Sequence, residues 1–141
     1  MTPDQKTLVK TTWSKVVPIA DTAAQMFYGR LFEIDPSTRP MFKSTDMAEQ
    51  RKKLMGALAS VIGGLDNLAL LIPVLQTLGK KHVAYGVVDR HYDSVGTALL
   101  WTLEQGLQDA WTPPVKDAWV AAYTAVAGVM RDAAKDASAA A

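Results

Sequence analysis

His82 is one of only two histidines in the chain, and its neighbours leave it several chemical roles. It lies in the stretch LGKKHVAYGV, residues 78–87, after two lysines and four residues after Leu78. On a helix this spacing brings the Leu78 carbonyl close to the imidazole. The side chain could be a surface residue, a core residue held by hydrogen bonds, or a metal ligand. A liganding imidazole keeps one nitrogen free and donates its other N–H to an oxygen.

Other chemistry has few candidates in this sequence. His91 lies nine residues later, in VDRHYDSV, and its charged neighbours at an expected helix start predict a solvated side chain. There is no cysteine, which excludes disulfides and thiolate chemistry, and two histidines cannot build a zinc finger or a multi-histidine cage. The motifs GxGxxG, GxSxG and HExxH and the P-loop are all missing. Nucleophilic catalysis is therefore not expected.

Length and composition indicate one domain spanning residues 1–141. Of the 141 residues, 49% are hydrophobic and 21% charged, as in ordinary globular proteins. A net charge of +1 argues against nucleic acid or an anionic membrane surface as a partner. The first ten residues, MTPDQKTLVK, are polar, and the apolar run of residues 54–65 is too short to span a bilayer. We expect a cytoplasmic protein without membrane insertion.

The elements that must position His82 are helices. Apolar residues recur with a helical period, and no segment alternates with a period of two. Helix boundaries are marked by Thr2-Pro3, Pro36, Asp46, Gly63-Gly64, Asp66-Asn67, Gly86, Asp89 and Thr112-Pro113. The fold class expected is all-α, with six to eight helices packed at varied angles. The alanine-rich residues 133–141 are expected to form a frayed tail.

Taken in order, these residues resemble the globin family over nearly the whole chain. The resemblance rests on Trp13, the FYGRLF and MF blocks within residues 27–42, Gln50 with Leu54, and His82 at 32 residues after Gln50. LGKKHVAYGV and AWTPPVKDAW are similar to neuroglobin. FYGRLF and EQRKKL are similar to single-domain bacterial haemoglobins and to the globin domain of flavohaemoglobins. The resemblance implies a globin fold around a haem pocket.

The resemblance also implies roles for single residues. His82 would bind the iron of a haem b, held non-covalently because the chain has no cysteine. Phe42 would pack against the porphyrin, although by itself it is an ordinary core aromatic. Tyr28 and Gln50 match the polar distal pair of bacterial haemoglobins, and Leu54 the apolar residue over the iron. Without the resemblance, Tyr28 would be a half-buried core tyrosine and Gln50 a solvated side chain. The remaining residues implied at the cofactor are Lys53, Leu78, Lys81, Val88 and Tyr92.

Several positions depart from the patterns of these relatives. Gln50 stands where many animal globins have a distal histidine, so we expect a five-coordinate ferrous iron rather than two-histidine ligation. Tyr92 matches the tyrosine that supports the proximal histidine in flavohaemoglobins. The glutamate that accompanies it is expected at position 134, which is alanine, and Asp132 lies about 200° around the helix from that position. A carboxylate that adds electron density to the iron is therefore not expected.

Two functions follow from the resemblance. The first is reversible binding of O2, and of NO and CO, at the iron. The alternative is nitric oxide dioxygenation, in which O2 held at haem reacts with NO to give nitrate. We expect no flavin or NAD(P)H domain, so the electrons for this reaction would come from a separate reductase. Lys53 and Lys81 could pair with haem propionates or be solvated lysines. A haem-free helical sensor would lack the proximal histidine, and His82 argues against that reading.

Overall fold

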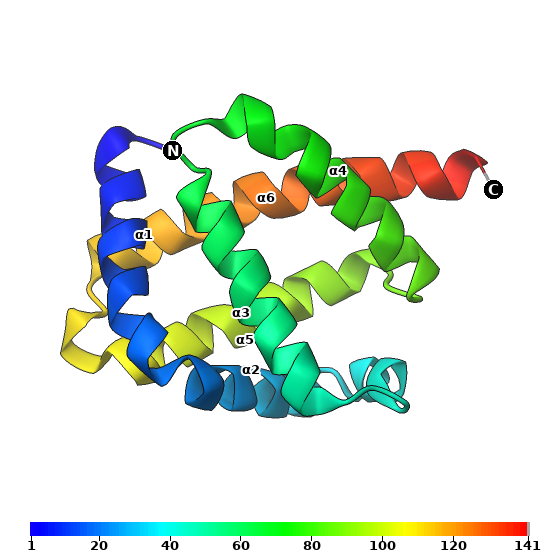
Figure 1. Cartoon of the computed structure of the whole chain (residues 1–141), viewed down its shortest axis with the longest axis horizontal. Coiled ribbons are helices and arrows are strands. Elements are labelled where there is room, and N and C mark those ends of the chain that lie inside the picture. Colours follow the sequence, from blue (N-terminus) through cyan, green and yellow to red (C-terminus); the bar gives the residue numbers. More distant parts are fainter. Residues whose placement is uncertain (141) are drawn as a thin grey trace.

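The computed structural model describes residues 1–140, with side chains as far as residue 137, and every regular element in this range is a helix (Figure 1). The α-helices are α1 Pro3–Val16, α2 Ala20–Ile34, α3 Met47–Gly63, α4 Leu68–Ala84, α5 Asp89–Leu107 and α6 Pro113–Ala140. Three short 3₁₀ helices join them: η1 Val17–Ile19, η2 Pro36–Phe42 and η3 Gln108–Ala110. The prediction of an all-α fold with six to eight helices is confirmed.

Capping residues begin the helices where the sequence predicts. The Thr2 hydroxyl accepts from the Gln5 backbone N–H at 3.1 Å, and the Gln5 side chain accepts from the Thr2 N–H at 3.0 Å. This reciprocal capping box satisfies two amides that the first turn leaves without helical partners. The Asp46 carboxylate caps α3 by accepting from the backbone N–H groups of Ala48 and Glu49. These caps fix the start of the helix that carries Gln50.

The helices pack in crossing pairs rather than as a parallel bundle. α4 packs on α6, α2 on α5, and α1 on α6, while α3 crosses in front of α5 in Figure 1. Two tryptophans anchor the crossing of α1 and α6, with the ring centroids of Trp13 and Trp119 6.4 Å apart. The Trp119 indole N–H donates to the buried Thr12 hydroxyl at 2.9 Å, which satisfies both polar groups inside the core.

One glycine lets α4 approach α6 closely. A Cβ atom on Gly79 would lie 2.4 Å from the Met130 carbonyl oxygen, closer than any real side chain could sit. Only glycine therefore allows the two backbones to pack at this distance. Gly79 comes three residues before His82, so this contact fixes the position and depth of the histidine-bearing turn.

The link between α4 and α5 turns at Gly86, whose φ of +88° lies in the left-handed region that favours glycine. α4 itself ends two residues earlier, at Ala84. At the other end of the chain, α6 continues as helix through Ala140 and buries Ala133, so the expected tail begins on a packed part of this helix. Ala141 lies outside the described residues. None of the helices in the described range combines the length and hydropathy needed to cross a bilayer.

Candidate functional site

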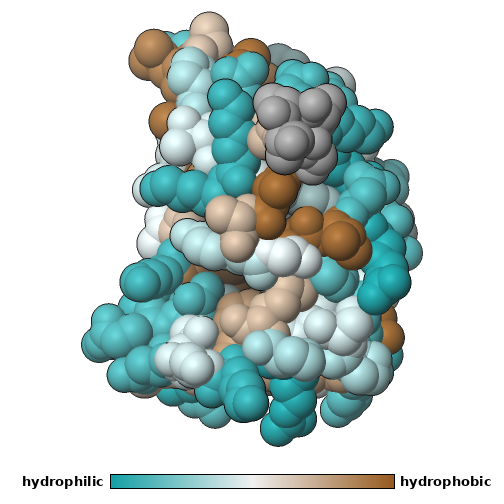
Figure 2. All heavy atoms as spheres, turned by 90° about the vertical axis from the view of Figure 1, so that its right-hand side faces the viewer, coloured by the Kyte–Doolittle hydropathy of each residue, from teal (hydrophilic) through white to brown (hydrophobic). Residues whose placement is uncertain are grey.

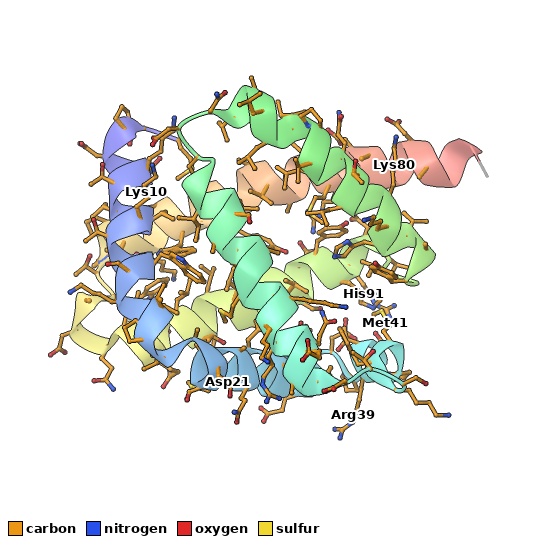
Figure 3. All side chains as sticks on the ribbon, in the orientation of Figure 1. Lys10, Asp21, Arg39, Met41, Lys80 and His91 are labelled. Atoms are coloured by element: carbon orange, nitrogen blue, oxygen red, sulfur yellow. The ribbon has the colours of Figure 1, made fainter. Side chains whose placement is uncertain are left out.

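An apolar cavity of about 300 Å³ lies between η2 and helices α2 to α6. Figure 3 shows the side chains that these helices direct inward, and Figure 2 shows the face at the right-hand end of Figure 1, where apolar residues gather across the middle between polar ones. Seven residues implied by the family resemblance line this one cavity: Tyr28, Phe42, Gln50, Leu54, Leu78, His82 and Tyr92. The fold therefore brings together residues that span 64 positions of sequence.

His82 presents one free nitrogen to the cavity. Its Nδ1 lies 2.6 Å from the Leu78 carbonyl oxygen, one helical turn earlier. A carbonyl only accepts, so Nδ1 carries the proton and Nε2 keeps its lone pair. The backbone of His82 is held as well, because its carbonyl accepts from the Val87 N–H at 3.0 Å. This is the orientation that a liganding imidazole requires.

On the opposite wall, Tyr28 of α2 and Gln50 of α3 form a hydrogen-bonded pair. The Gln50 side-chain Nε2 donates to the Tyr28 hydroxyl oxygen at 3.1 Å. The tyrosine oxygen accepts this bond, so its own proton remains available for a group inside the cavity. Burial raises the pKa of the Tyr28 hydroxyl, and the Gln50 hydrogen bond opposes that rise. The hydroxyl is therefore protonated, and a donor, at neutral pH.

Aromatic and aliphatic side chains build the wall around this pair. The Phe42 ring meets the Tyr28 ring edge-on, with centroids 5.4 Å apart and an interplanar angle of 69°. The Phe32 ring packs against both, with its centroid 6.1 Å from that of Tyr28 and 5.8 Å from that of Phe42. Leu54 follows Gln50 by four residues on the same face of α3 and also lines the cavity. Tyr28 thus reaches its position through packing as well as through hydrogen bonding.

Tyr92 of α5 is buried, with 7% of the residue exposed, yet its hydroxyl has no hydrogen-bond partner among the described residues. The Tyr92 backbone carbonyl accepts from the Tyr123 hydroxyl, and the Arg131 guanidinium lies 5.3 Å from the Tyr92 ring centroid. Burial raises the pKa of Tyr92, whereas the Arg131 charge lowers it. A buried polar group without a partner is costly, so this hydroxyl is expected to lower the stability of the protein.

Among the described residues, no carboxylate accepts a hydrogen bond from the Tyr92 hydroxyl. Position 134 is alanine, and Asp132 is exposed. Two exposed carboxylates, those of Asp89 and Asp93, approach by pairing with the Arg131 guanidinium at 3.4 Å and 2.6 Å. A cation, rather than a carboxylate, therefore contacts the Tyr92 ring.

Three of the residues implied at the cofactor do not reach the cavity wall of the described structure. Lys53 and Lys81 are exposed, on the outer faces of α3 and α4. Val88 is 50% exposed, because the turn at Gly86 directs Val87 inward and leaves Val88 as the residue that precedes α5. Val87 lines the cavity in its place.

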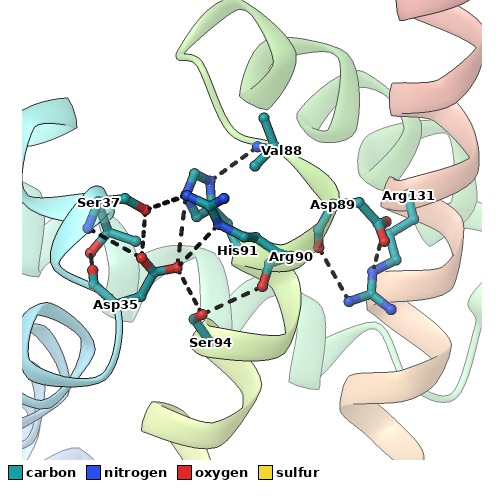
Figure 4. A network of polar contacts seen from close by, with 9 residues as sticks. Asp35, Ser37, Val88, Asp89, Arg90, His91, Ser94 and Arg131 are labelled. Atoms are coloured by element: carbon teal, nitrogen blue, oxygen red, sulfur yellow. Dashed lines mark hydrogen bonds and ion pairs between the residues drawn. The ribbon is translucent and has the colours of Figure 1, made fainter.

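The prediction of a solvated His91 is wrong. The side chain is buried and lines the cavity, and both ring nitrogens are engaged (Figure 4). Nδ1 accepts from the Val88 backbone N–H at 3.0 Å, and Nε2 lies 3.1 Å from the Ser37 hydroxyl. The local sequence did contain an indication of the bond to Val88, because a polar side chain three residues after a helix cap can bond back to the cap amide. The partner in η2 could not be seen from the local sequence.

The family model described as Globin matches residues 25–130. The flavohemoprotein of Vibrio cholerae serotype O1 is 32% identical over 134 residues, which cover 94% of this chain and 34% of that protein. Neuroglobin-1 of Oncorhynchus mykiss is 29% identical and is covered over 90% of its length. A bacterial globin from Campylobacter jejuni superimposes with a TM-score of 0.83 at 25% identity, over 96% of this chain and 97% of that one. The chain spans about a third of the flavohemoproteins it matches.

Proposed function

The chain belongs to the globin family, and we propose that it binds haem b non-covalently and holds O2 reversibly, with NO and CO as further ligands. Haem would supply an iron that binds diatomic gases. The observation that carries the proposal is one cavity with a free imidazole nitrogen on one side and a free hydroxyl proton on the other. In this proposal His82 is the iron ligand, and Tyr28 is the donor to the bound gas.

The residues present fit such a cofactor. The cavity wall is mostly apolar and includes the flat ring of Phe42, as a porphyrin requires. Within residues 1–140 no group of three or more His, Cys, Asp or Glu side chains gathers to hold a metal ion, whereas one imidazole nitrogen suits a metal that brings its own macrocycle. Lys53 and Lys81 would pair with propionates only at the exposed rim, where such pairs stabilise by about 0–1 kcal/mol.

The distal pair favours tight retention of O2. O2 held at a haem would carry partial negative charge, and a buried O–H donor such as Tyr28 would stabilise that charge. Gln50 donates to the Tyr28 oxygen. This bond orients the hydroxyl and leaves its proton free to donate to a bound gas. Leu54, on the same face of α3 as Gln50, lines the cavity and limits its volume. Slow O2 release suits storage, scavenging or sensing rather than bulk transport.

A second candidate function is nitric oxide dioxygenation. The flavohemoprotein relatives and the polar distal pair favour it, and a reductase outside residues 1–141 would supply the electrons. Reduced protein mixed with O2 and NO should react readily for a single turnover. Sustained NO consumption should be poor with NADH alone and should rise when a cell extract containing reductases is added. Robust turnover with NADH and no added reductase would contradict the need for a separate partner.

The proposal is tested by the absorption spectra of the purified protein in its oxidised, reduced and CO-bound forms, followed by exposure of the reduced protein to O2. We expect haem bands in all forms, a CO adduct, and an O2 adduct that releases its ligand slowly and returns to the ligand-free spectrum. A protein that takes up no haem during expression or reconstitution would overturn the proposal. Haem that is oxidised at once by O2, without a stable adduct, would overturn the O2-binding role.

A further inference from the structure

His91 joins two segments that line the cavity but lie far apart in sequence. One is η2, which contributes Met41 and Phe42, and the other is residues 85–88, which contribute Val87. Figure 3 places His91 and Met41 at the same end of the molecule. The His91 side chain is only 7% exposed, and it contacts Val88 on one side and Ser37 on the other.

The hydrogen bonds fix which nitrogen of His91 carries the proton. The Val88 backbone N–H is a donor, so Nδ1 accepts and the proton of the neutral ring sits on Nε2. Nε2 therefore donates towards the Ser37 hydroxyl oxygen at 3.1 Å. That oxygen also accepts from the Arg90 guanidinium at 3.0 Å and donates its own proton to the Asp35 carboxylate (Figure 4). Each polar group in this contact is satisfied while His91 is neutral.

Asp35 anchors the arrangement. Its carboxylate accepts from the backbone N–H and hydroxyl of Ser37 and from the hydroxyl of Ser94, and it lies 3.9 Å from both Arg90 Nε and His91 Nε2. The hydrogen bond from the Ser37 hydroxyl lowers the pKa of Asp35 most, burial opposes it, and the Ser94 hydroxyl lowers the pKa further. The carboxylate therefore stays ionised at neutral pH and holds the start of η2 against the first turn of α5.

A hydrolytic role for this cluster is excluded by the proton positions. Asp35, Ser37 and His91 are the residue types of a nucleophilic triad, but there the histidine nitrogen beside the serine must be free to take the hydroxyl proton. Here that nitrogen carries a proton, and the serine proton is given to Asp35. The cluster can hold segments together, but it cannot activate a nucleophile.

We propose that His91 is a positioning residue that latches residues 85–88 to η2 and thereby slows loss of the cofactor; this rests on the proposed haem binding. For a bound cofactor to leave, the segments that line the cavity must separate, which is a local opening rather than global unfolding. His91 stabilises the closed arrangement from inside the wall. It also reaches the iron-binding position indirectly, since residue 87 donates its backbone N–H to the His82 carbonyl.

The first test measures the rate at which haem passes from the intact, haem-loaded protein to an excess of a haem-binding apoprotein. His91→Phe fills the same space but removes both hydrogen bonds, and we expect roughly tenfold faster loss. His91→Asn keeps an acceptor near the Val88 N–H but loses Ser37, so its rate should fall between those of wild type and His91→Phe. Ser37→Ala should resemble His91→Asn. The matched control is Thr97→Ala, which removes an exposed hydroxyl that bonds the Asp93 carbonyl within α5 and touches neither Val88 nor Ser37, and we expect less than a twofold change.

A second measurement, hydrogen exchange at the Val88 amide, needs no cofactor. In the haem-free protein, the Val88 amide should exchange its hydrogen faster in His91→Phe than in wild type or Ser37→Ala, because only the first variant loses the bond to that amide. Unchanged haem loss in His91→Phe, with normal haem content, would overturn the latch while leaving haem binding intact. If the wild type binds no haem, the proposed function fails instead, and unchanged Val88 exchange would separately overturn the latch. Should His91→Phe not fold, His91→Asn and Ser37→Ala carry the test.

Discussion

The His82 imidazole and the Tyr28 hydroxyl, on the two sides of the cavity, are oriented by different kinds of contact. On the His82 side, the ligand nitrogen is oriented within a single helix, by a carbonyl four residues earlier. On the Tyr28 side, the donor is oriented across two helices, by a glutamine 22 residues later in sequence. The orientation of His82 is therefore a local property of α4, whereas the orientation of Tyr28 depends on how α2 and α3 pack. Changes in packing should disturb gas release before they disturb iron ligation.

The largest effect is expected from removing the proposed iron ligand on the His82 side. His82→Ala removes the only imidazole that the structure orients with a free nitrogen in the cavity, so haem should be lost or held very weakly. The protein should also unfold more easily, because haem bound only to the native state stabilises it by mass action. Haem content after purification and thermal unfolding measure both effects.

The matched control for that variant is Lys81→Ala, at the exposed position next to His82. It should keep its haem, since an exposed lysine contributes little. A His82→Ala protein with a full complement of haem and an unchanged reduced spectrum would show that His82 is not the ligand.

The next effect concerns the distal side alone. Tyr28→Phe keeps the ring that packs on Phe42 but removes the proton that we assign to the bound gas. A hydrogen bond contributes about 0.5–1.5 kcal/mol, and more to a charged acceptor. Because 1.4 kcal/mol corresponds to a factor of ten, O2 release should accelerate roughly tenfold or more. CO accepts hydrogen bonds weakly, so its release should change much less. Equal, small changes for both gases in stopped-flow measurements would reduce Tyr28 to a packing residue.

A smaller effect tests whether the distal pair acts as a unit. Gln50→Leu removes the donor that orients the Tyr28 hydroxyl, so we expect O2 release to accelerate about threefold to fivefold, less than in Tyr28→Phe. The double variant should release O2 little faster than Tyr28→Phe alone, because the glutamine acts through the tyrosine. Independent, additive effects on the logarithm of the rate would mean that Gln50 contacts the gas directly.

The smallest effect compares the same substitution on the two sides. Tyr28→Phe should destabilise the haem-free protein by about 1 kcal/mol, because it leaves the Gln50 donor unpaired. Tyr92→Phe removes a buried hydroxyl that has no partner among the described residues, so it should leave that protein equally stable or up to about 1 kcal/mol more stable. Urea unfolding of the two haem-free variants measures the difference. A clear loss of stability in Tyr92→Phe would mean that its hydroxyl is already satisfied without cofactor.

The features that follow from local spacing could be predicted from the sequence. The capping box at Thr2, the contact between His82 and the Leu78 carbonyl, and the shared face of Gln50 and Leu54 all depend on residues three or four apart. Each is a consequence of helical geometry, which the apolar period already indicated. The meeting of Tyr28 and Gln50 needed the family resemblance, since it joins two helices.

The features that the sequence could not give depend on the packing of distant segments. His91 has charged neighbours, yet Asp35 and Ser37, more than 50 positions earlier, bury it. The inward-facing valine differs by one position from the expected Val88, because a single left-handed residue at Gly86 redirects the chain. Gly79 gave no local sign of its role, which only the closeness of α6 reveals.

The most direct test of the central claim is the absorption spectrum of the ferrous protein without added ligand. One imidazole of the described structure, that of His82, offers a free nitrogen to the cavity, while Tyr28 and Gln50 face it from the opposite wall. The predicted result is a five-coordinate, high-spin ferrous haem that binds CO or O2 without first releasing a protein ligand. A six-coordinate, low-spin spectrum with the two-histidine pattern would contradict the account.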